Sequence, residues 1–173
     1  ELLNAAGDVV FSGGPATLHA AVGEAPPPVD IPTHYTGPGA NATSVTVSPA
    51  TAIGIAGGTV DFVGTALDAN GTVLPGTPIQ WTSLDPALVT FPNQTSGHAV
   101  IGLVRGTAHV RATLVTGPTA DAAITINPVA AAIALGSGNA QTGTVGTALA
   151  QPFVVKATAT DGLPIAGVIV SFA

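Results

Sequence analysis

The sequence predicts an all-β protein of antiparallel strands with essentially no helix. Short runs rich in β-branched residues alternate apolar and polar positions, and clusters of Gly, Pro, Asn and Asp separate them about every 8–12 residues. No stretch of a dozen residues repeats its apolar positions at the helical spacing. The 46% hydrophobic content argues against a disordered chain. These features together indicate a β-sandwich or β-barrel.

Charge is sparse and acidic, which excludes several classes of function. Only 7% of the residues are charged, the net charge is −6, and the bases are Arg105, Arg111 and Lys156. Nucleic-acid binding needs clustered Lys and Arg, so nucleic acid is not an expected partner. The absence of Cys excludes disulfides and thiolate metal sites. The longest purely apolar run covers 129–135, too short for a membrane span of about 20 residues.

The N-terminal part divides into a hairpin and a linker. Residues 1–23 are expected to form a β-hairpin stub, with arms at 9–11 and 16–22 and a turn at 12–15. Because one hairpin is marginal in water, it must pack on something else. Residues 24–43 contain five prolines and are expected to form a semi-stiff, extended linker without fixed secondary structure. No basic signal-peptide n-region is visible at the N-terminus, and a removed signal stays open.

A full set of strands is expected in residues 44–127. Turn signals such as Asp68-Ala69-Asn70-Gly71 bound them. Trp81, the only tryptophan, is expected in the core, because a large buried ring on the third strand organises this kind of sandwich. Alternation of sides along the strands predicts that its core neighbours are Val60, Phe62, Ile79 and Val110. The expected strands are 44–48, 59–67, 79–83, 88–91 and a hairpin of 99–104 with 107–115 across Arg105-Gly106, and 122–126 either closes the sheet or leads out of it.

Motifs in residues 43–127 resemble the group-2 bacterial immunoglobulin-like domain. They are Val45-Thr46-Val47-Ser48-Pro49, Gly57 with Val60-Asp61-Phe62, Asp68-Ala69-Asn70-Gly71, Trp81-Thr82-Ser83-Leu84-Asp85-Pro86 and Gly102-Leu103-Val104-Arg105-Gly106-Thr107-Ala108, in that order. The resemblance implies an immunoglobulin-like β-sandwich.

Residues 129–173 resemble the first half of an invasin/intimin-type bacterial immunoglobulin-like domain, which places an incomplete second domain at 128–173. The matching residues include Ser137-Gly138-Asn139, Gln141-Thr142-Gly143, Asp161-Gly162 and Gly167-Val168 with Val170-Ser171-Phe172. The family domain runs about twice this length, so the segment is expected to be an incomplete second sandwich. More chain, a partner protein or the N-terminal hairpin could complete it.

Residues with catalytic or metal-binding chemistry are few. No pair of His19, His34, His98 and His109 has a metal-ligand spacing, and no nucleophile elbow or phosphate loop occurs. No catalytic, cofactor-binding or metal-binding residue is therefore expected, although turn carboxylates at a domain boundary leave a shared calcium site open. Alternation along one strand places three side chains on a face that meets solvent or a partner: His109, Arg111 and Thr113.

These observations predict a non-enzymatic structural or adhesive module without a cofactor. The resembled families serve as spacers or binding modules of bacterial surface proteins, which implies an extracytoplasmic location in the periplasm, at the cell surface or secreted, and a protein partner. Two alternatives remain. One is an accessory or scaffolding subunit docked on the periplasmic face of a larger, membrane-embedded complex, which the low charge favours. The other is a carbohydrate-binding appendage of a secreted enzyme, which needs exposed aromatic rings.

Overall fold

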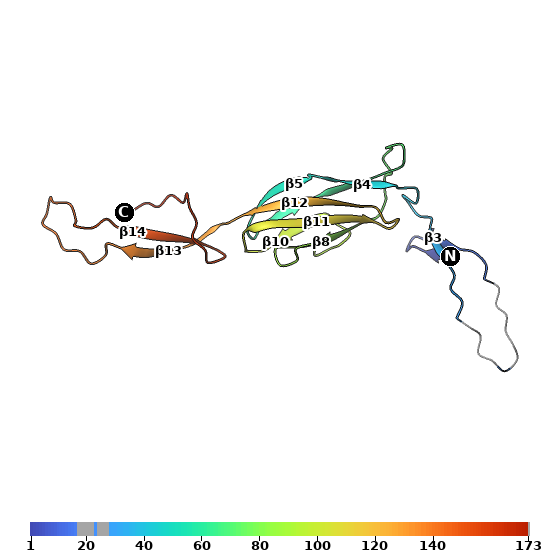
Figure 1. The fold of residues 1–173 in the computed structure, drawn as a ribbon, viewed down its shortest axis with the longest axis horizontal. Helices are drawn as coiled ribbons and strands as arrows, with labels where there is room; N and C mark the ends of the chain where they lie inside the picture. Colours follow the sequence, from blue (N-terminus) through green and yellow to red (C-terminus); the bar gives the residue numbers. More distant parts are fainter. Residues whose placement is uncertain (17–22, 24–27, 173) are drawn as a thin grey trace.

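The structure is a computed structural model that describes residues 1–16, 23 and 28–172. The described residues form strands, turns and loops and contain no helix, so the prediction of an all-β fold built mainly of antiparallel strands is confirmed. The central sandwich lies between a small N-terminal sheet and a C-terminal two-stranded sheet, which sit at its opposite ends (Figure 1).

Two layers face each other in the central sandwich. One layer is a four-stranded sheet in the order β5-β12-β11-β8, and the other combines the pair β4-β7 with the sheet β6-β10-β9. The pairing of β12 with β5 is parallel, unlike the antiparallel pairing expected throughout. The strands are β4 (Ser44–Ser48), β5 (Thr51–Ile55), β6 (Thr59–Asp61), β7 (Val63–Leu67), β8 (Ile79–Ser83), β9 (Val89–Thr90), β10 (His98–Ile101), β11 (Gly106–Leu114) and β12 (Thr119–Asn127).

Three details of the central sandwich correct the sequence-based strands. The single strand expected at 59–67 is divided at Phe62, and its halves β6 and β7 pair with different partners. The hairpin expected across Arg105-Gly106 does not form, because β10 and β11 belong to opposite layers and residues 102–105 cross between them. Instead β11 pairs with β12, so residues 119–127 close the sheet rather than lead out of it.

The core lies between the two layers, where alternating positions of each strand point inward. Ala108, Val110, Ala112 and Leu114 from β11 alternate with exposed or half-buried neighbours, and Ala122, Ile124 and Ile126 from β12 do the same. These side chains are at most 3% exposed. No buried polar or charged residue interrupts the core of the described chain. Burial of these apolar side chains away from water is the main source of stability.

The N-terminal sheet differs from the predicted hairpin and linker. Its strands are β1 (Leu2–Leu3), β2 (Val9–Gly13) and β3 (Thr33–Tyr35), in the order β1-β2-β3. Strand β2 therefore pairs with β1 and β3, whereas the second hairpin arm expected at 16–22 lies outside the described residues except for Ala16. The expected linker at 24–43 is not free of secondary structure, since β3 lies within it. The Tyr35 ring meets the edge of Phe11, with centroids 5.4 Å apart, which explains this pairing.

The C-terminal segment has two strands and almost no core of its own. Strands β13 (Ala130–Ser137) and β14 (Val154–Ala159) pair antiparallel, and every residue of β13 is exposed. Within 130–172, only Gly138 and Ala159 are buried. Large apolar side chains stay exposed, among them Ile133, Leu135 and Phe172. The described residues contain no helix that is long and apolar enough to cross a membrane.

Candidate functional site

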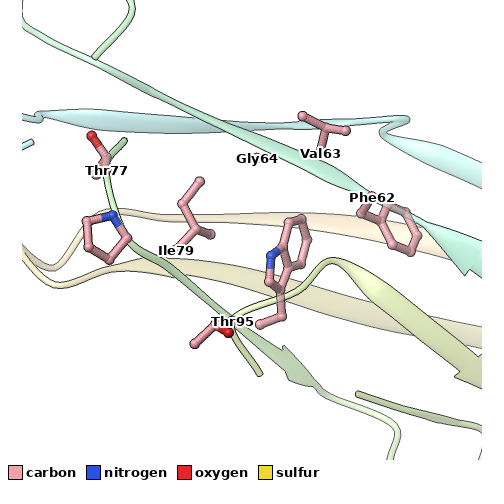
Figure 2. Close-up of a pocket in the computed structure, with 8 residues that line it drawn as sticks. Phe62, Val63, Gly64, Thr77, Ile79 and Thr95 are labelled. Atoms are coloured by element: carbon pink, nitrogen blue, oxygen red, sulfur yellow. The ribbon is translucent and has the colours of Figure 1, made fainter. Parts of the chain in front are cut away.

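Trp81 anchors the core of the sandwich beside a shallow hollow. Its side chain is 3% exposed, and the ring centroids of Phe62 and Phe91 lie 6.0 and 5.8 Å away. Of the expected core residues, Phe62 and Val110 are also buried, whereas Val60 and Ile79 are half-buried and pack against the core. The hollow measures about 340 Å³ and lies between β7 and β8 (Figure 2). It is lined by Phe62, Val63, Gly64, Thr77, Pro78, Ile79, Trp81 and Thr95.

Two glycines explain how the indole fits between the layers. A Cβ on Gly97 would collide with the carbonyl oxygen of Phe62, while the Phe62 N–H donates to the Gly97 carbonyl at 2.9 Å. A Cβ on Gly64 would lie 2.6 Å from the Ile79 side chain and 3.4 Å from the indole. The backbone therefore approaches the ring closely, and the hollow beside it is lined by apolar and hydroxyl groups without a titratable side chain.

The expected partner-facing residues lie on the outer surface of the β5-β12-β11-β8 sheet. His109 is exposed, while Arg111 and Thr113 are half-buried on the same side of β11. The Arg111 guanidinium donates to both carboxylate oxygens of Asp121 at 2.7 and 2.8 Å, across directly opposite positions of β11 and β12. His109 contacts Asp85, whose carboxylate accepts from the His109 backbone N–H at 2.7 Å and lies 3.2 Å from its Nδ1.

These contacts keep the carboxylates ionised. The backbone hydrogen bond from His109 is the largest cause that lowers the pKa of Asp85. The hydrogen bond from Arg111 lowers the pKa of Asp121 in the same direction. A third pair joins His98 Nδ1 to Asp61 at 2.6 Å between β10 and β6. Each described pair is a single imidazole or guanidinium with a single carboxylate on open sheet surface, and the described residues hold no group of three metal-ligating side chains.

A further charged contact joins the sandwich to the C-terminal segment, and sequence reasoning missed it. Arg105 lies in the 102–105 crossing, and its Nε and Nη2 donate to the two carboxylate oxygens of Asp161 at 2.6 and 2.9 Å. The same guanidinium donates to the carbonyls of Pro164 and Leu163 at 3.2 and 3.3 Å. Close by, the Thr160 hydroxyl donates to the Leu103 carbonyl at 2.8 Å. The residues of these contacts are together called the joint: Leu103, Arg105, Thr160, Asp161, Leu163 and Pro164.

Of the two charged side chains in the joint, Asp161 is shielded from water and Arg105 is partly exposed. The Asp161 side chain is 3% exposed and that of Arg105 is 30% exposed. The hydrogen bonds from Arg105 hold the pKa of Asp161 far below its ordinary value, and the paired carboxylate raises the pKa of Arg105. The sequence offered one signal for this contact: basic residues are scarce, and one of the three, Arg105, lies in a connection between strands.

Comparison with known proteins finds few matches. No family model matches the chain, and no curated protein matches it. Among solved structures, a match is found to domains 4–9 of the surface layer protein SbsC, with 14% identity and a TM-score of 0.40. The match covers 72% of this chain and 21% of the SbsC chain, so this chain spans about a fifth of that structure.

Proposed function

We propose that the chain is a non-enzymatic, extracytoplasmic structural module that acts as a spacer or protein-binding unit of a surface protein. The observation that carries this proposal is the end-to-end arrangement: the N-terminal sheet and the C-terminal segment lie at opposite ends of the sandwich (Figure 1). Such an arrangement holds the two terminal segments of the chain apart. The extracytoplasmic location is supported by the resemblance of residues 43–127 and 129–173 to bacterial immunoglobulin-like domains.

The chemistry of the hollows supports a non-enzymatic role. Four of the hollows on the described surface measure 210–350 Å³, and none of these four is lined by Asp, Glu, His, Lys or Arg. General acid–base catalysis needs such a group within hydrogen-bond reach of a bound substrate. The His–Asp pairs sit instead on open sheet surface. Function is therefore expected to come from shape and contact surface.

An accessory subunit of a larger complex is the second candidate, and the exposed apolar side chains of the C-terminal segment favour it. Val145, Ile169 and Phe172 are 101%, 91% and 64% exposed. No charged residue lies between Asp121 and Lys156. A weakly charged apolar surface loses little hydration when a partner covers it. In this case the same segment would bind another protein rather than extend a spacer.

Carbohydrate binding is the weakest of the three candidates. A sugar-binding platform needs an exposed aromatic ring, and Trp81 is buried. Phe153 and Phe172 are exposed and have ring centroids 6.4 Å apart, so they are the aromatic pair on which this alternative would depend. Phe153→Ala would then abolish binding on a glycan array, whereas the spacer proposal expects no binding by the unaltered chain.

Solution scattering of the purified chain tests the spacer proposal. A compact domain of this length has a radius of gyration of roughly 16 Å. The proposal expects a clearly larger radius for the monomer, measured at low concentration. A compact monomer would contradict it. A chain that aggregates alone and becomes soluble on addition of a co-purified membrane complex would favour the accessory subunit.

A further inference from the structure

The joint occupies the place where two structural units meet. Residues 102–105 lie at the end of the sandwich that the C-terminal segment approaches, and only Pro128 and Val129 separate β12 from β13 (Figure 1). The hydrophobic core of the sandwich ends with Val129, which packs against it. Nothing in that core therefore holds β13 and β14 in place, and polar contacts have to set their orientation.

The Arg105 guanidinium uses its planar set of N–H donors to bind several oxygens of one turn. It donates to four oxygens that belong to the turn after β14: two of Asp161 and the carbonyls of Leu163 and Pro164. A planar guanidinium fixes the orientation of a carboxylate through two parallel hydrogen bonds, which a point charge cannot do. The Asp161 side chain is almost removed from water, so removal of Arg105 would leave an unpaired carboxylate at this position unless the two units separate.

The turn after β14 has a second copy elsewhere in the chain. In the turn after β14, Ala159 N–H donates to the Leu163 carbonyl at 2.8 Å, and Gly162 has a φ of 77°. The turn after β7 repeats this: Asp68 N–H donates to the Thr72 carbonyl at 3.0 Å, and Gly71 has a φ of 79°.

Asn70 occupies the position of Asp161 in the copy after β7. No Arg or Lys side chain of the described chain donates to that turn. The turn therefore forms without a carboxylate at this position. The Asp68 carboxylate instead accepts from the Asn70 and Thr72 N–H groups, both at 2.8 Å. The Asp161 carboxylate has two roles: its Oδ1 accepts from the Leu163 N–H of its own turn at 3.0 Å, and both of its oxygens accept from Arg105.

We propose that the surface around Leu103 and Arg105 is a docking site for the turn of the following unit, and that it locks the C-terminal segment at one orientation relative to the sandwich. The partner that it fits is an acidic turn whose carboxylate and two backbone carbonyls face the guanidinium, here Asp161 to Pro164. Loss of the Arg105 contacts would leave the two units connected by Pro128, Val129 and the single hydrogen bond from Thr160 to Leu103, which does not fix an orientation, so that they swivel. This inference specifies the stiffness of the proposed spacer.

Distance measurements between two spin labels test the lock. The chain has no Cys, so Thr82→Cys and Val145→Cys provide unique labelling positions on the sandwich and on the C-terminal segment. Both residues are exposed. The labelled chain is expected to give one narrow distance distribution. Arg105→Ala and Asp161→Asn should each make it at least about twice as broad, because a two-residue linker then sets the range of motion.

Two controls separate loss of the lock from loss of the fold. Arg111→Ala removes a guanidinium that makes the same two-oxygen contact, but with Asp121 on the outer surface of the sandwich. This variant should leave the distance distribution narrow. Trp81 fluorescence reports whether the sandwich stays folded in each variant. Arg105→Lys keeps the charge but loses the planar contact, and it should broaden the distribution to an intermediate width.

Two outcomes would overturn the proposal: a broad distribution in the unaltered chain, or a distribution that stays narrow in folded Arg105→Ala. Raising the salt from about 0.1 M to about 1 M shortens the screening length from about 10 Å to about 3 Å. The lock predicts no broadening, because water and ions have little access to Asp161. A broad distribution in an extended monomer would refute the lock and leave the spacer proposal standing.

Discussion

Trp81 and Phe62 face each other between the two layers of the sandwich, with ring centroids 6.0 Å apart and ring planes inclined by 31°. Both side chains are at most 5% exposed. Phe62 lies at the break between β6 and β7, and its N–H bonds Gly97 instead of a strand partner. The contact therefore links the strand β8 of one layer to the point where the other layer changes pairing.

Replacement of Trp81 by Ala is expected to destabilise the chain by about 3–5 kcal/mol, as large-to-small changes in a packed core do. Urea unfolding followed by circular dichroism measures this, since the variant has no tryptophan fluorescence. Trp81→Phe fills part of the volume and should cost clearly less. A change below about 1 kcal/mol for Trp81→Ala would show that the indole is not a core residue.

Gly97→Ala is expected to destabilise the sandwich although it adds one methyl group. The new Cβ would collide with the Phe62 carbonyl, and backbone atoms cannot turn aside as a side chain does. Overpacking of this kind costs roughly 1–3 kcal/mol. Gly14→Ala is the matched control, because a Cβ there meets no atom within 4 Å. Equal unfolding midpoints for the two variants would contradict the close approach.

The sequence predicted most strands well but not how they pair. Alternation of apolar and polar residues locates β4 and β8 at 44–48 and 79–83, as the structure has them. The same alternation occurs in 98–101 and 106–114, whether these strands pair with each other or face each other across the core. Inward-facing residues such as Ala99 and Val110 satisfy both arrangements, so the short Arg105-Gly106 connection was taken for a hairpin turn.

The charged surfaces were predictable only where both partners lie on known strands. The outward position of His109 and Arg111 follows from alternation within one strand. Arg105 and Asp161 are 56 positions apart and lie in connections, where no periodicity reports direction. The wrong hairpin prediction also hid this pair, because it placed Arg105 in a tight turn rather than in a crossing between the two layers.

The free edge of β13 is expected to promote self-association at high concentration. Edge strands of natural proteins usually carry charges that oppose pairing with another chain, and β13 carries none. Ile133→Lys should therefore reduce the dimer fraction in analytical ultracentrifugation. Thr125→Lys adds the same charge on the outer face of β12, a strand that is paired on both sides, and should have less effect. If the unaltered chain stays monomeric at high concentration, the β13 edge is already protected.

The joint is expected to survive mild acid. Arg105 lowers the folded-state pKa of Asp161, so the contact contributes stability that is complete above the ordinary Asp pKa of about 4 and is lost only as the pH falls through the lower folded value. The distance distribution between labels at positions 82 and 145 should therefore be as narrow at pH 5 as at pH 7. Asp161→Asn, which cannot ionise, should be broad at both values. If the unaltered chain broadens between pH 7 and pH 5 while its Trp81 fluorescence stays constant, protonation of Asp161 does not govern the lock.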